Sequence, residues 1–298
     1  FPLFEKVDVN VKLPSLDDPS SIDGNLTWHS KTVKMVVSLE RPRTLFGSGV
    51  SAAKVAVSSD PINFTYDGTL TGGQSLGLAG SLSLDIPSVR DLASWTGNPI
   101  PLKGTGLGPF SLKGKVSGST GKLALSDVSL ALDAIKGTGA LAVDTTGAKP
   151  AVKGKLDIDM LDLNPYLASG GKTTAAPPSS PSPAGQPGGA TDTGWSTAPI
   201  DMSALKMANV DFALGVGGIR YEKIAIGKSA LSTRLQDGKL TADLSQLALY
   251  QGSGSGKVTV DASGATPAIA ADFTLSGVQA EPLLTAAVDF TRLTGTGN

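Results

Sequence analysis

Along most of this chain, hydrophobic residues alternate with small or polar residues in short runs that end at turns rich in glycine. Leu123 and Leu125 begin one such run; after Asp127 the parity shifts, and Val128 and Leu130 carry the alternation on. A period of two residues that is sustained over many segments predicts β-strands with one apolar and one polar face. We therefore expect an all-β protein whose strands form an elongated, twisted antiparallel sheet.

The pattern is also repeated. Residues 121–167 and 238–284 align without a gap at an offset of 117, and 16 of the 47 aligned positions are identical. Chance would give about four matches in so skewed a composition. Residues 80–95 resemble 154–169 and indicate a weaker third copy. The same group of strands has thus been laid down at least twice.

Two kinds of segment interrupt the strands. Residues 169–194 contain five prolines and no apolar side chain larger than alanine, which predicts a disordered loop between a segment 1–168 and a segment 195–298. Glycine-rich turns are expected, one of them at 137–139. Short helical pieces are expected at the four places that lack the alternation and carry helix-start signals: 88–96, 165–168, 201–207 and 281–290.

An apolar sheet face must be covered. The four short helical pieces are too small to cover a face of this size. One solution is a β-sandwich or solenoid, in which two sheets cover each other; the protein would then be a structural scaffold or an adhesin without a lipid ligand. The other is a single sheet that curls into an open trough and covers a ligand. The pattern alone leaves both possibilities open.

Composition removes several classes of function. The chain of 298 residues has a net charge of −1, which gives no electrostatic basis for binding nucleic acid. It has no cysteine and a single histidine, so thiolate sites and multi-histidine metal sites are excluded. No run of 18 apolar residues is present. The chain begins with Phe1, without a signal peptide, and we expect it to be a piece of a longer protein.

The few residues that invite a chemical interpretation have simpler explanations. His29 has no evident partner for acid–base catalysis and is expected to lie half-exposed on a strand. Asp157 and Asp159 alternate with apolar residues, which indicates the solvent face of a strand rather than a calcium loop, and Asp162 is expected to begin a turn. We therefore expect no enzymatic activity, no metal and no cofactor.

Glycines and aromatic residues are interpreted in the same way. The sequences GLG at 106–108 and GSGSG at 252–256 lack the strand-loop-helix context of a phosphate loop, so turns or sharp bends of the sheet are expected there. Four isolated aromatic residues are expected to plug the ends of the sheet rather than to mark a ligand site. They are Trp95, Tyr166, Trp195 and Tyr250.

The ordered series of motifs resembles the AsmA family of Gram-negative bacteria. The matching text includes LDIPSVRDLASWTG, IDMSALKMANVDFAL, DGKLTADLSQLALYQGSGSGKVTVD, VQAEPLL and LTGTGN, with the proline-rich loop between the two halves. It covers about residues 75–298. The resemblance implies a periplasmic protein that is anchored in the inner membrane by an N-terminal helix, which this chain lacks, and that is associated with outer-membrane assembly. It also implies similarity to bridge-like lipid-transfer proteins.

Together, the pattern and the resemblance favour the open trough. The expected function is a non-enzymatic binding surface for the acyl chains of phospholipids or other membrane lipids, which would support their movement between the two membranes. The residues expected to line the trough are Leu123, Leu125, Leu130, Leu132, Leu141, Val143, Leu156, Ile158, Leu240, Leu247, Leu249, Val258, Val260, Ile269, Phe273 and Leu275.

Overall fold

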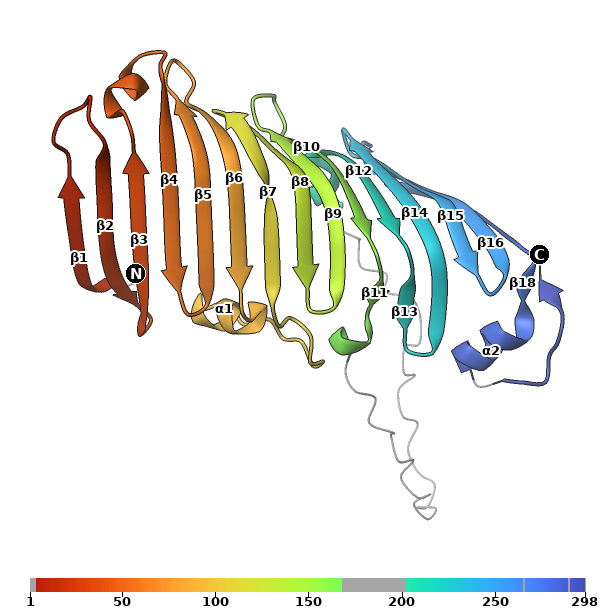
Figure 1. Cartoon of the computed structure of the whole chain (residues 1–298). Coiled ribbons are helices and arrows are strands. Elements are labelled where there is room, and N and C mark those ends of the chain that lie inside the picture. The colour runs from red at the N-terminus through yellow and green to blue at the C-terminus, as the bar shows by residue number, and fades with distance from the viewer. Residues whose placement is uncertain (1–3, 168–201, 265, 289, 298) are drawn as a thin grey trace, which may run out of the picture.

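Alternating apolar residues form strands along the whole chain in the computed structural model, which describes residues 4–167, 202–264, 266–288 and 290–297. Within these residues, seventeen strands join in one sheet (Figure 1). The first ten are β1 (Phe4–Lys12), β2 (Ser20–Trp28), β3 (Lys31–Leu39), β4 (Val50–Ser59), β5 (Ile62–Thr71), β6 (Gly77–Ile86), β7 (Phe110–Ser119), β8 (Lys122–Leu132), β9 (Ile135–Asp144) and β10 (Ala151–Ile158). The all-β prediction is confirmed.

The second half of the chain continues the same sheet. Its strands are β11 (Leu161–Asp162), β12 (Asn209–Val216), β13 (Ile219–Tyr221), β14 (Ile224–Gln236), β15 (Lys239–Leu249), β16 (Gly252–Asp261) and β17 (Ala268–Ser276). Two further strands, β18 (Val278–Gln279) and β19 (Thr296–Gly297), pair with each other. Each long strand pairs with its neighbour in sequence from β1 to β10 and again from β14 to β17.

One junction in the middle departs from the expected antiparallel order. β10 pairs with β12 in parallel, with Ala151 opposite Asn209 and Ile158 opposite Val216. β11 and β13 continue the parallel pairing, and β12 and β13 both pair antiparallel with β14. The predicted loop 169–194 falls outside the described residues. Through these pairings, the strands of the predicted segment 1–168 and those of the predicted segment 195–298 belong to one continuous sheet.

Side chains fasten this junction at both ends. At one end, Lys149 Nζ lies 2.8 Å from Asp237 Oδ1, and the backbone N–H of Asp237 donates to Asn209 Oδ1 at 3.1 Å. At the other end, Asn164 imitates a strand residue: its Oδ1 accepts from the backbone N–H of Glu222 at 2.5 Å, and its Nδ2 donates to the carbonyl of Glu222 at 3.4 Å. These contacts supply bonds that a tight hairpin would supply elsewhere.

The internal repeat is visible in the structure at the offset found in the sequence. β8 and β9 begin and end 117 residues before β15 and β16, and β11 lies 117 residues before β18. The turn after each second strand is built alike. Asp144 accepts from the backbone N–H and the hydroxyl of Thr146, and Asp261 accepts in the same way from Ser263. These hydrogen bonds are the main cause that lowers the pKa of each carboxyl group.

The parity shift after Asp127 is a β-bulge. The ladder between β8 and β9 skips from Leu125 to Val128, and Asp127 takes a φ of 50°. Because a bulge inserts an extra residue on one strand, it restores the apolar side chains to the same face after the shift. The turn expected at 137–139 was misplaced, because both glycines lie inside β9 and the chain turns before Ile135.

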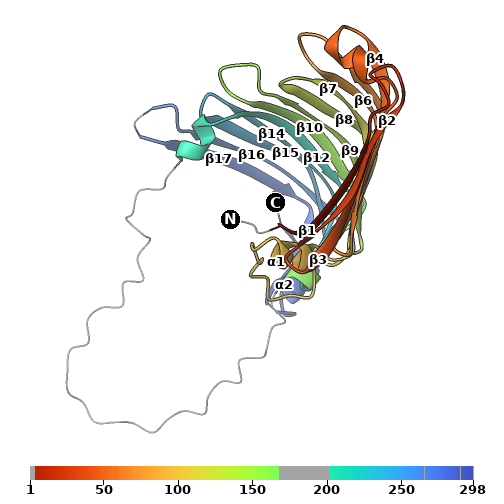
Figure 2. The ribbon, with the colours of Figure 1, turned by 90° about the vertical axis from the view of Figure 1, so that its left-hand side faces the viewer.

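Seen along its length, the sheet curls into an arc (Figure 2). Helices lie along one of its long edges, which we call the lower edge as it is drawn in Figure 1. They are α1 (Val89–Trp95), the 3₁₀ helix η2 (Asn164–Tyr166) and α2 (Ala280–Val288). Two more 3₁₀ helices, η1 (Pro42–Phe46) and η3 (Ser203–Lys206), lie elsewhere. All four expected helical pieces are present, the third of them as η3.

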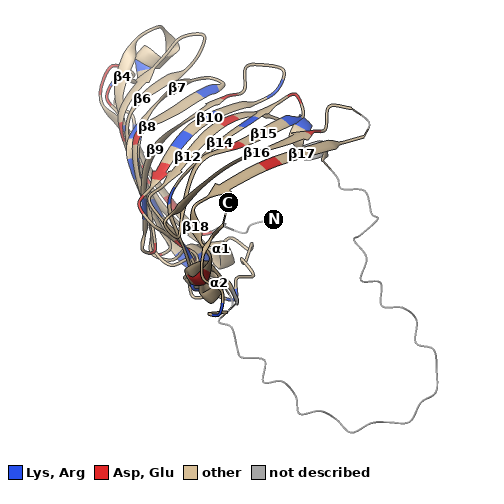
Figure 3. Cartoon of the chain, turned by 90° about the vertical axis from the view of Figure 1, so that its right-hand side faces the viewer, with Lys and Arg blue, Asp and Glu red and all other residues tan. Residues whose placement is uncertain are grey.

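The sandwich alternative is wrong for the described part of the chain. Its long strands belong to one sheet, and no second large sheet faces it. Charged residues of both signs are spread over the strands (Figure 3). Many form cross-strand ion pairs, such as Lys54 with Asp67 at 2.9 Å and Arg234 with Asp211 at 3.2 Å. Because no second large sheet covers these described strands, the sheet is open. The ion pairs lie on one of its faces, and the other face is apolar.

Candidate functional site

The apolar face is continuous across the sheet. Residues that lie directly opposite each other on paired strands point to the same side of a sheet. From β8 onward, one row of such partners contains only aliphatic residues over eight strands. It runs Leu123, Val143, Val152, Val210, Leu235, Leu240, Val260 and Ile269. The parallel junction lies inside this row and does not interrupt it.

Three more rows lie below the first and complete the face, each including some glycine or small polar residues. The second is Leu125, Leu141, Gly154, Phe212, Thr233, Ala242, Val258 and Ala271; the third is Gly139, Leu156, Leu214, Leu231, Leu244, Gly256 and Phe273; the fourth is Leu130, Gly137, Ile158, Val216, Ser229, Leu247, Gly254 and Leu275. Leu132, opposite Ile135, and Leu249, opposite Ile226, extend this face at the lower edge. All sixteen residues predicted to line the trough thus lie on one face. Their contact with lipid stays a prediction.

The residue prediction missed the part of this face that holds a cluster of buried residues. A hollow of about 350 Å³ lies over β3 to β7. Ala53, Tyr66 and Val116 form its buried base, and Leu39 and Leu82 are among the side chains around them. The strand pattern at 34–39 and 65–70 signalled apolar positions here, but the absence of a repeat partner kept them out of the predicted set. This hollow opens on the apolar face, and we call that face the trough.

Most apolar side chains of the trough are only half-buried by the protein itself, and those of β17 are exposed. Ten hydrophobic residues of the described chain are buried, whereas twenty large ones are exposed. At the far end, Ile269 is 61 % exposed, Phe273 65 % and Leu275 45 %. A contiguous exposed apolar surface of this kind usually marks a binding site.

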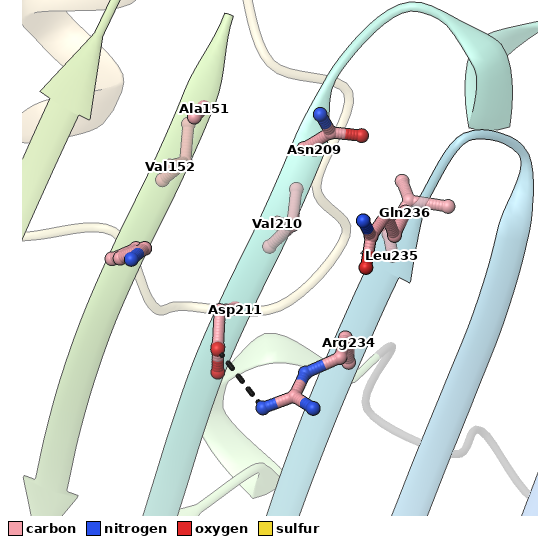
Figure 4. Close-up of a pocket in the computed structure, with 9 residues that line it drawn as sticks. Ala151, Val152, Asn209, Val210, Asp211, Arg234, Leu235 and Gln236 are labelled. Atoms are coloured by element: carbon pink, nitrogen blue, oxygen red, sulfur yellow. Dashed lines mark hydrogen bonds and ion pairs between the residues drawn. The ribbon is translucent and has the colours of Figure 1, made fainter.

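A second hollow, also of about 350 Å³, lies at the parallel junction and is polar (Figure 4). Lys153, Asn209, Asp211, Arg234 and Gln236 line it from the face opposite to the trough, together with parts of Val152, Val210 and Leu235. Figure 4 shows Arg234 directed at Asp211, and both side chains are more than half exposed. An exposed ion pair of this kind contributes little to binding or stability.

Comparison with known proteins identifies the family. The sequence model of the AsmA family matches residues 82–298. The chain belongs to the AsmA family. No curated protein and no solved structure matches it significantly. Membership suggests a role in outer-membrane assembly or lipid transport in the cell envelope.

The match begins in β6, so the AsmA-family region includes most of the trough but only part of the hollow over β3 to β7. No helix among the described residues of this AsmA-family chain is long and apolar enough to cross a membrane.

The lower edge of the trough is closed first by an aromatic cluster. Trp28, at the end of β2, meets Trp95 of α1 edge-on with 4.5 Å between ring centroids, and the Trp95 Nε1–H donates to the carbonyl of Trp28 at 3.1 Å. His29 stacks on Trp28 and contacts the carbonyl of Trp95 through Nδ1 at 2.7 Å. Since a carbonyl only accepts, the Nδ1 atom of His29 carries the proton.

The expectation for His29 needs one correction. It lies in the turn after β2 with a φ of 42°, not on the strand, and its side chain is exposed. The sequence did not predict this turn because the residues that form it, in the sequence Trp-His-Ser, include no glycine or proline. Trp95 does lie at the end of the sheet, as expected of the isolated aromatic residues, whereas Trp195 falls outside the described residues.

A polar cluster closes the middle of the lower edge. The carboxylate of Asp133 accepts from the backbone N–H groups of Leu107 and Gly108 at 3.0 and 2.9 Å, and from the hydroxyl of Tyr166 at 2.7 Å. Burial and this hydrogen bond raise the pKa of Tyr166 well above its usual value. Asp133 thus occupies the backbone amides of Leu107 and Gly108. The carbonyl of Pro165 occupies that of Gly106 at 2.8 Å, so none of the three amides of the GLG sequence is left for a phosphate group.

The other glycine-rich sequence is not a turn. Gly252, Gly254 and Gly256 lie inside β16 on the trough face, opposite Leu249, Leu247 and Leu244 of β15. Tyr250, in the turn just before β16, is one of the aromatic residues expected at a sheet end, and it lies there.

The three aspartates following β9 are not close enough to form a metal site. Asp157 lies on β10 and pairs with Lys155 at 2.9 Å, on the face opposite to the trough. Asp159 lies just beyond the strand. Asp162 accepts from the backbone N–H of Asn164 at 3.0 Å, so it begins the turn as predicted. No group of three potential metal ligands is found in the described part of the chain.

Proposed function

We propose that this chain binds the acyl chains of membrane lipids along the trough and supports their movement between the two membranes of the cell envelope. The observation that carries the proposal is the first apolar row, which continues through eight strands without a charged residue. We place this activity in the periplasm, with the full-length protein anchored to the inner membrane. AsmA-family membership supports this location.

The physical task sets what such a surface must supply. Exposing a buried methylene group to water costs about 0.8 kcal/mol, so two chains of about 16 carbons cost on the order of 25 kcal/mol. An apolar surface that extends from one strand to the next lowers this cost at each position along the path. It needs no residue that recognises a particular headgroup and no residue that makes or breaks a bond.

The exposure of the trough residues supports ligand contact over self-burial. In a closed core, side chains as large as those of Phe273 and Ile269 are covered by other side chains. Here they are more than half exposed. Because the two hydrophobic residues lie on the same face of one strand, in the first and third rows with only Ala271 between them, an acyl chain can cover both at once.

The test uses two adjacent residues of β17 that point to opposite faces. Leu275→Asp places a charge in the trough, and Thr274→Asp places the same charge on the other face. Both positions are exposed, so both variants are expected to fold, as judged by circular dichroism. The measurements are lipid extraction with mass spectrometry of the purified chain and transfer of a fluorescent phospholipid between vesicles of phosphatidylethanolamine and phosphatidylglycerol.

We expect phospholipid on the parent chain and on Thr274→Asp, and at least severalfold less on Leu275→Asp. Ile158→Asp, in the same row near the middle of the sheet, should act in the same direction. A parent chain that reproducibly carries no lipid and transfers none contradicts the proposal. So does equal lipid on Leu275→Asp and Thr274→Asp.

A further inference from the structure

Three aromatic side chains of the trough lie over glycines. Phe212 of β12 is directly opposite Gly154 of β10, and Phe273 of β17 is directly opposite Gly256 of β16. Tyr66 of β5 lies over Gly80 of β6. These contacts occur in the first half, at the parallel junction and at the end of the sheet.

In each case the ring occupies the space that a β-carbon on the glycine would need. A Cβ at Gly154 would lie 2.9 Å from both Cδ2 and Cε2 of Phe212, and a Cβ at Gly80 would lie 2.9 Å from Cε2 of Tyr66. A Cβ at Gly256 would overlap the ring of Phe273. Real Cβ atoms do not approach a ring so closely, so each ring rests against the glycine backbone.

Tyr66 shows the resulting orientation most clearly. Its hydroxyl group donates to backbone carbonyls of the sheet itself, with the oxygen 2.9 Å from Thr69 O and 3.2 Å from Ala79 O. A ring whose far end is bonded to the sheet lies along the sheet instead of rising from it. Burial of this side chain raises the pKa of Tyr66, in keeping with its covered position.

Glycine needs such a reason in a strand. It weakens a strand and is usually found where another group approaches the backbone closely. None of Gly80, Gly154 and Gly256 has a positive φ, so backbone conformation does not explain them. Close approach of the aromatic rings explains Gly154 and Gly256. A Cβ at Gly80 would instead meet the backbone of β5 first, with Asp67 O at 2.5 Å and Gly68 Cα at 2.6 Å, and the Tyr66 ring next.

We propose that Tyr66, Phe212 and Phe273 form the floor over which acyl chains move, and that the paired glycines position the rings flat so that none obstructs the trough. This rests on the proposed function, because it assigns the path within the same trough. The glycines are positioning residues, and the rings are the groups in contact with lipid.

The internal repeat offers a natural comparison. Gly139 and Gly256 occupy the same place in the two copies, and the residues opposite them are Leu156 and Phe273. Both copies keep the glycine although the large residue differs. The two glycines differ in what approaches them: an added Cβ would meet the ring of Phe273 at Gly256, but the backbone of Lys155 and Leu156 at Gly139.

The test is a double-mutant cycle at the parallel junction. Gly154→Ala adds a methyl group that contacts the Phe212 ring, so the ring must leave its position and rise into the trough. Phe212→Leu removes the ring. The double variant has the methyl group without the ring. Circular dichroism and thermal melting establish that each variant is folded, and phospholipid transfer between the vesicles described above gives the rate.

We expect Gly154→Ala to slow transfer by about threefold to tenfold, the effect of moving a side chain out of its preferred rotamer along the path. Phe212→Leu removes one ring of the floor and should itself lower the rate by about twofold, and adding Gly154→Ala to it should cause no further loss, so that the double variant transfers lipid faster than Gly154→Ala alone. The quantity of lipid that co-purifies with Gly154→Ala should match the parent. A merely structural glycine would not be rescued by the removal of the ring.

Each failure is distinguishable. If the parent transfers lipid and Gly154→Ala transfers it equally fast, the floor is wrong and the proposed function stands. A double variant that is as slow as Gly154→Ala also overturns the floor. If the parent neither carries nor transfers lipid, both proposals fall. Should Gly154→Ala not fold, Gly256→Ala with Phe273→Leu repeats the cycle on β17, where the ring is 65 % exposed and free to move.

Discussion

The trough has the same chemistry over β3 to β7 and on β17 but different exposure. Over β3 to β7, Ala53 is 4 % exposed and Val116 6 %. On β17, the last strand of this sheet in the chain, Ile269 is 61 % exposed and Phe273 65 %. Both regions come from strands with the same alternation of apolar and polar residues. Exposure on this sheet thus depends on how the neighbouring side chains are arranged in space, not on hydrophobicity along the strand.

The difference in exposure implies that the two regions of the apolar face have different roles. In the first region the side chains cover one another around Tyr66 and Val116, so their burial stabilises the fold. In the second region few protein side chains cover the apolar residues, so only a bound ligand would bury them. A charge should therefore unfold the first region and leave the second folded but unable to bind lipid.

The largest effect is expected for Val116→Asp. Its side chain lies at the base of the hollow, where a carboxylate would have neither water nor a partner. An unpaired buried charge costs several kcal/mol, which is comparable to the whole free energy of unfolding of a domain. Urea denaturation should show that the variant is unfolded or close to it.

The matched control is Ser117→Asp. Ser117 is the next residue on β7, is exposed and points to the opposite face. Its unfolding midpoint should stay near that of the parent. If both variants behave alike, the hollow is not a core, and the distinction between the regions fails.

The next effect concerns the lower edge between the two regions. Asp133→Ala removes the acceptor for two backbone N–H groups and the hydroxyl of Tyr166. Buried donors that lose their acceptor cost about 1–3 kcal/mol each, with part of this recovered through water. We expect the free energy of unfolding to fall by about 2–3 kcal/mol in urea titrations. A change below about 0.5 kcal/mol would show that the cluster does not hold the lower edge.

Alkaline pH tests the same cluster in another way. The pKa of Tyr166 is raised, so the neutral phenol contributes stability that is fully present below the ordinary tyrosine pKa of about 10. This contribution is lost as the pH rises above that value. The melting temperature should fall between pH 9 and pH 11 by more in the parent than in Tyr166→Phe, which has no proton to lose. Equal falls would show that Tyr166 contributes nothing to the pH dependence.

The sequence predicted the strands well because their signal is local. Alternation in a strand such as β8 needs no knowledge of its neighbours, and the parity shift at Asp127 even located a β-bulge. The repeat placed Leu156 and Phe273 at matching positions on one face before any partner strand was known.

What the sequence left open depends on distant contacts. The parallel pairing of β10 with β12 joins residues that are 58 positions apart in the sequence, such as Ala151 and Asn209, and no local pattern encodes it. The hollow arises where five strands curve around Tyr66, and no repeat partner pointed to it. The sequence predicted a strand at His29. In the structure His29 has a positive φ in a turn and contacts Trp95, 66 residues away, and no local pattern encodes this contact.

A smaller effect on stability is expected for Ile269→Asp, which completes the comparison with Val116→Asp. The chemical change is similar, but this side chain is largely in water, so the charge keeps its hydration. We expect the melting temperature to change by less than about 3 °C, corresponding to less than about 1 kcal/mol. Lipid bound to the purified chain should nevertheless fall. Unfolding of this variant would show that the far end of the trough is as closed as the hollow.

The smallest effect is expected on the opposite face, where the two regions should not differ at all. Lys54 and Asp67 form an ion pair behind the hollow, and Arg234 and Asp211 form one behind the second half of the trough. All four side chains are more than half exposed, so solvent screens each pair and little stability depends on it. Lys54→Ala and Arg234→Ala should each change the melting temperature by less than about 2 °C and leave lipid transfer unchanged. A larger fall in melting temperature for Lys54→Ala alone would mean that side chains on both faces of the first region contribute to its stability. The difference between the regions would then no longer belong to the trough.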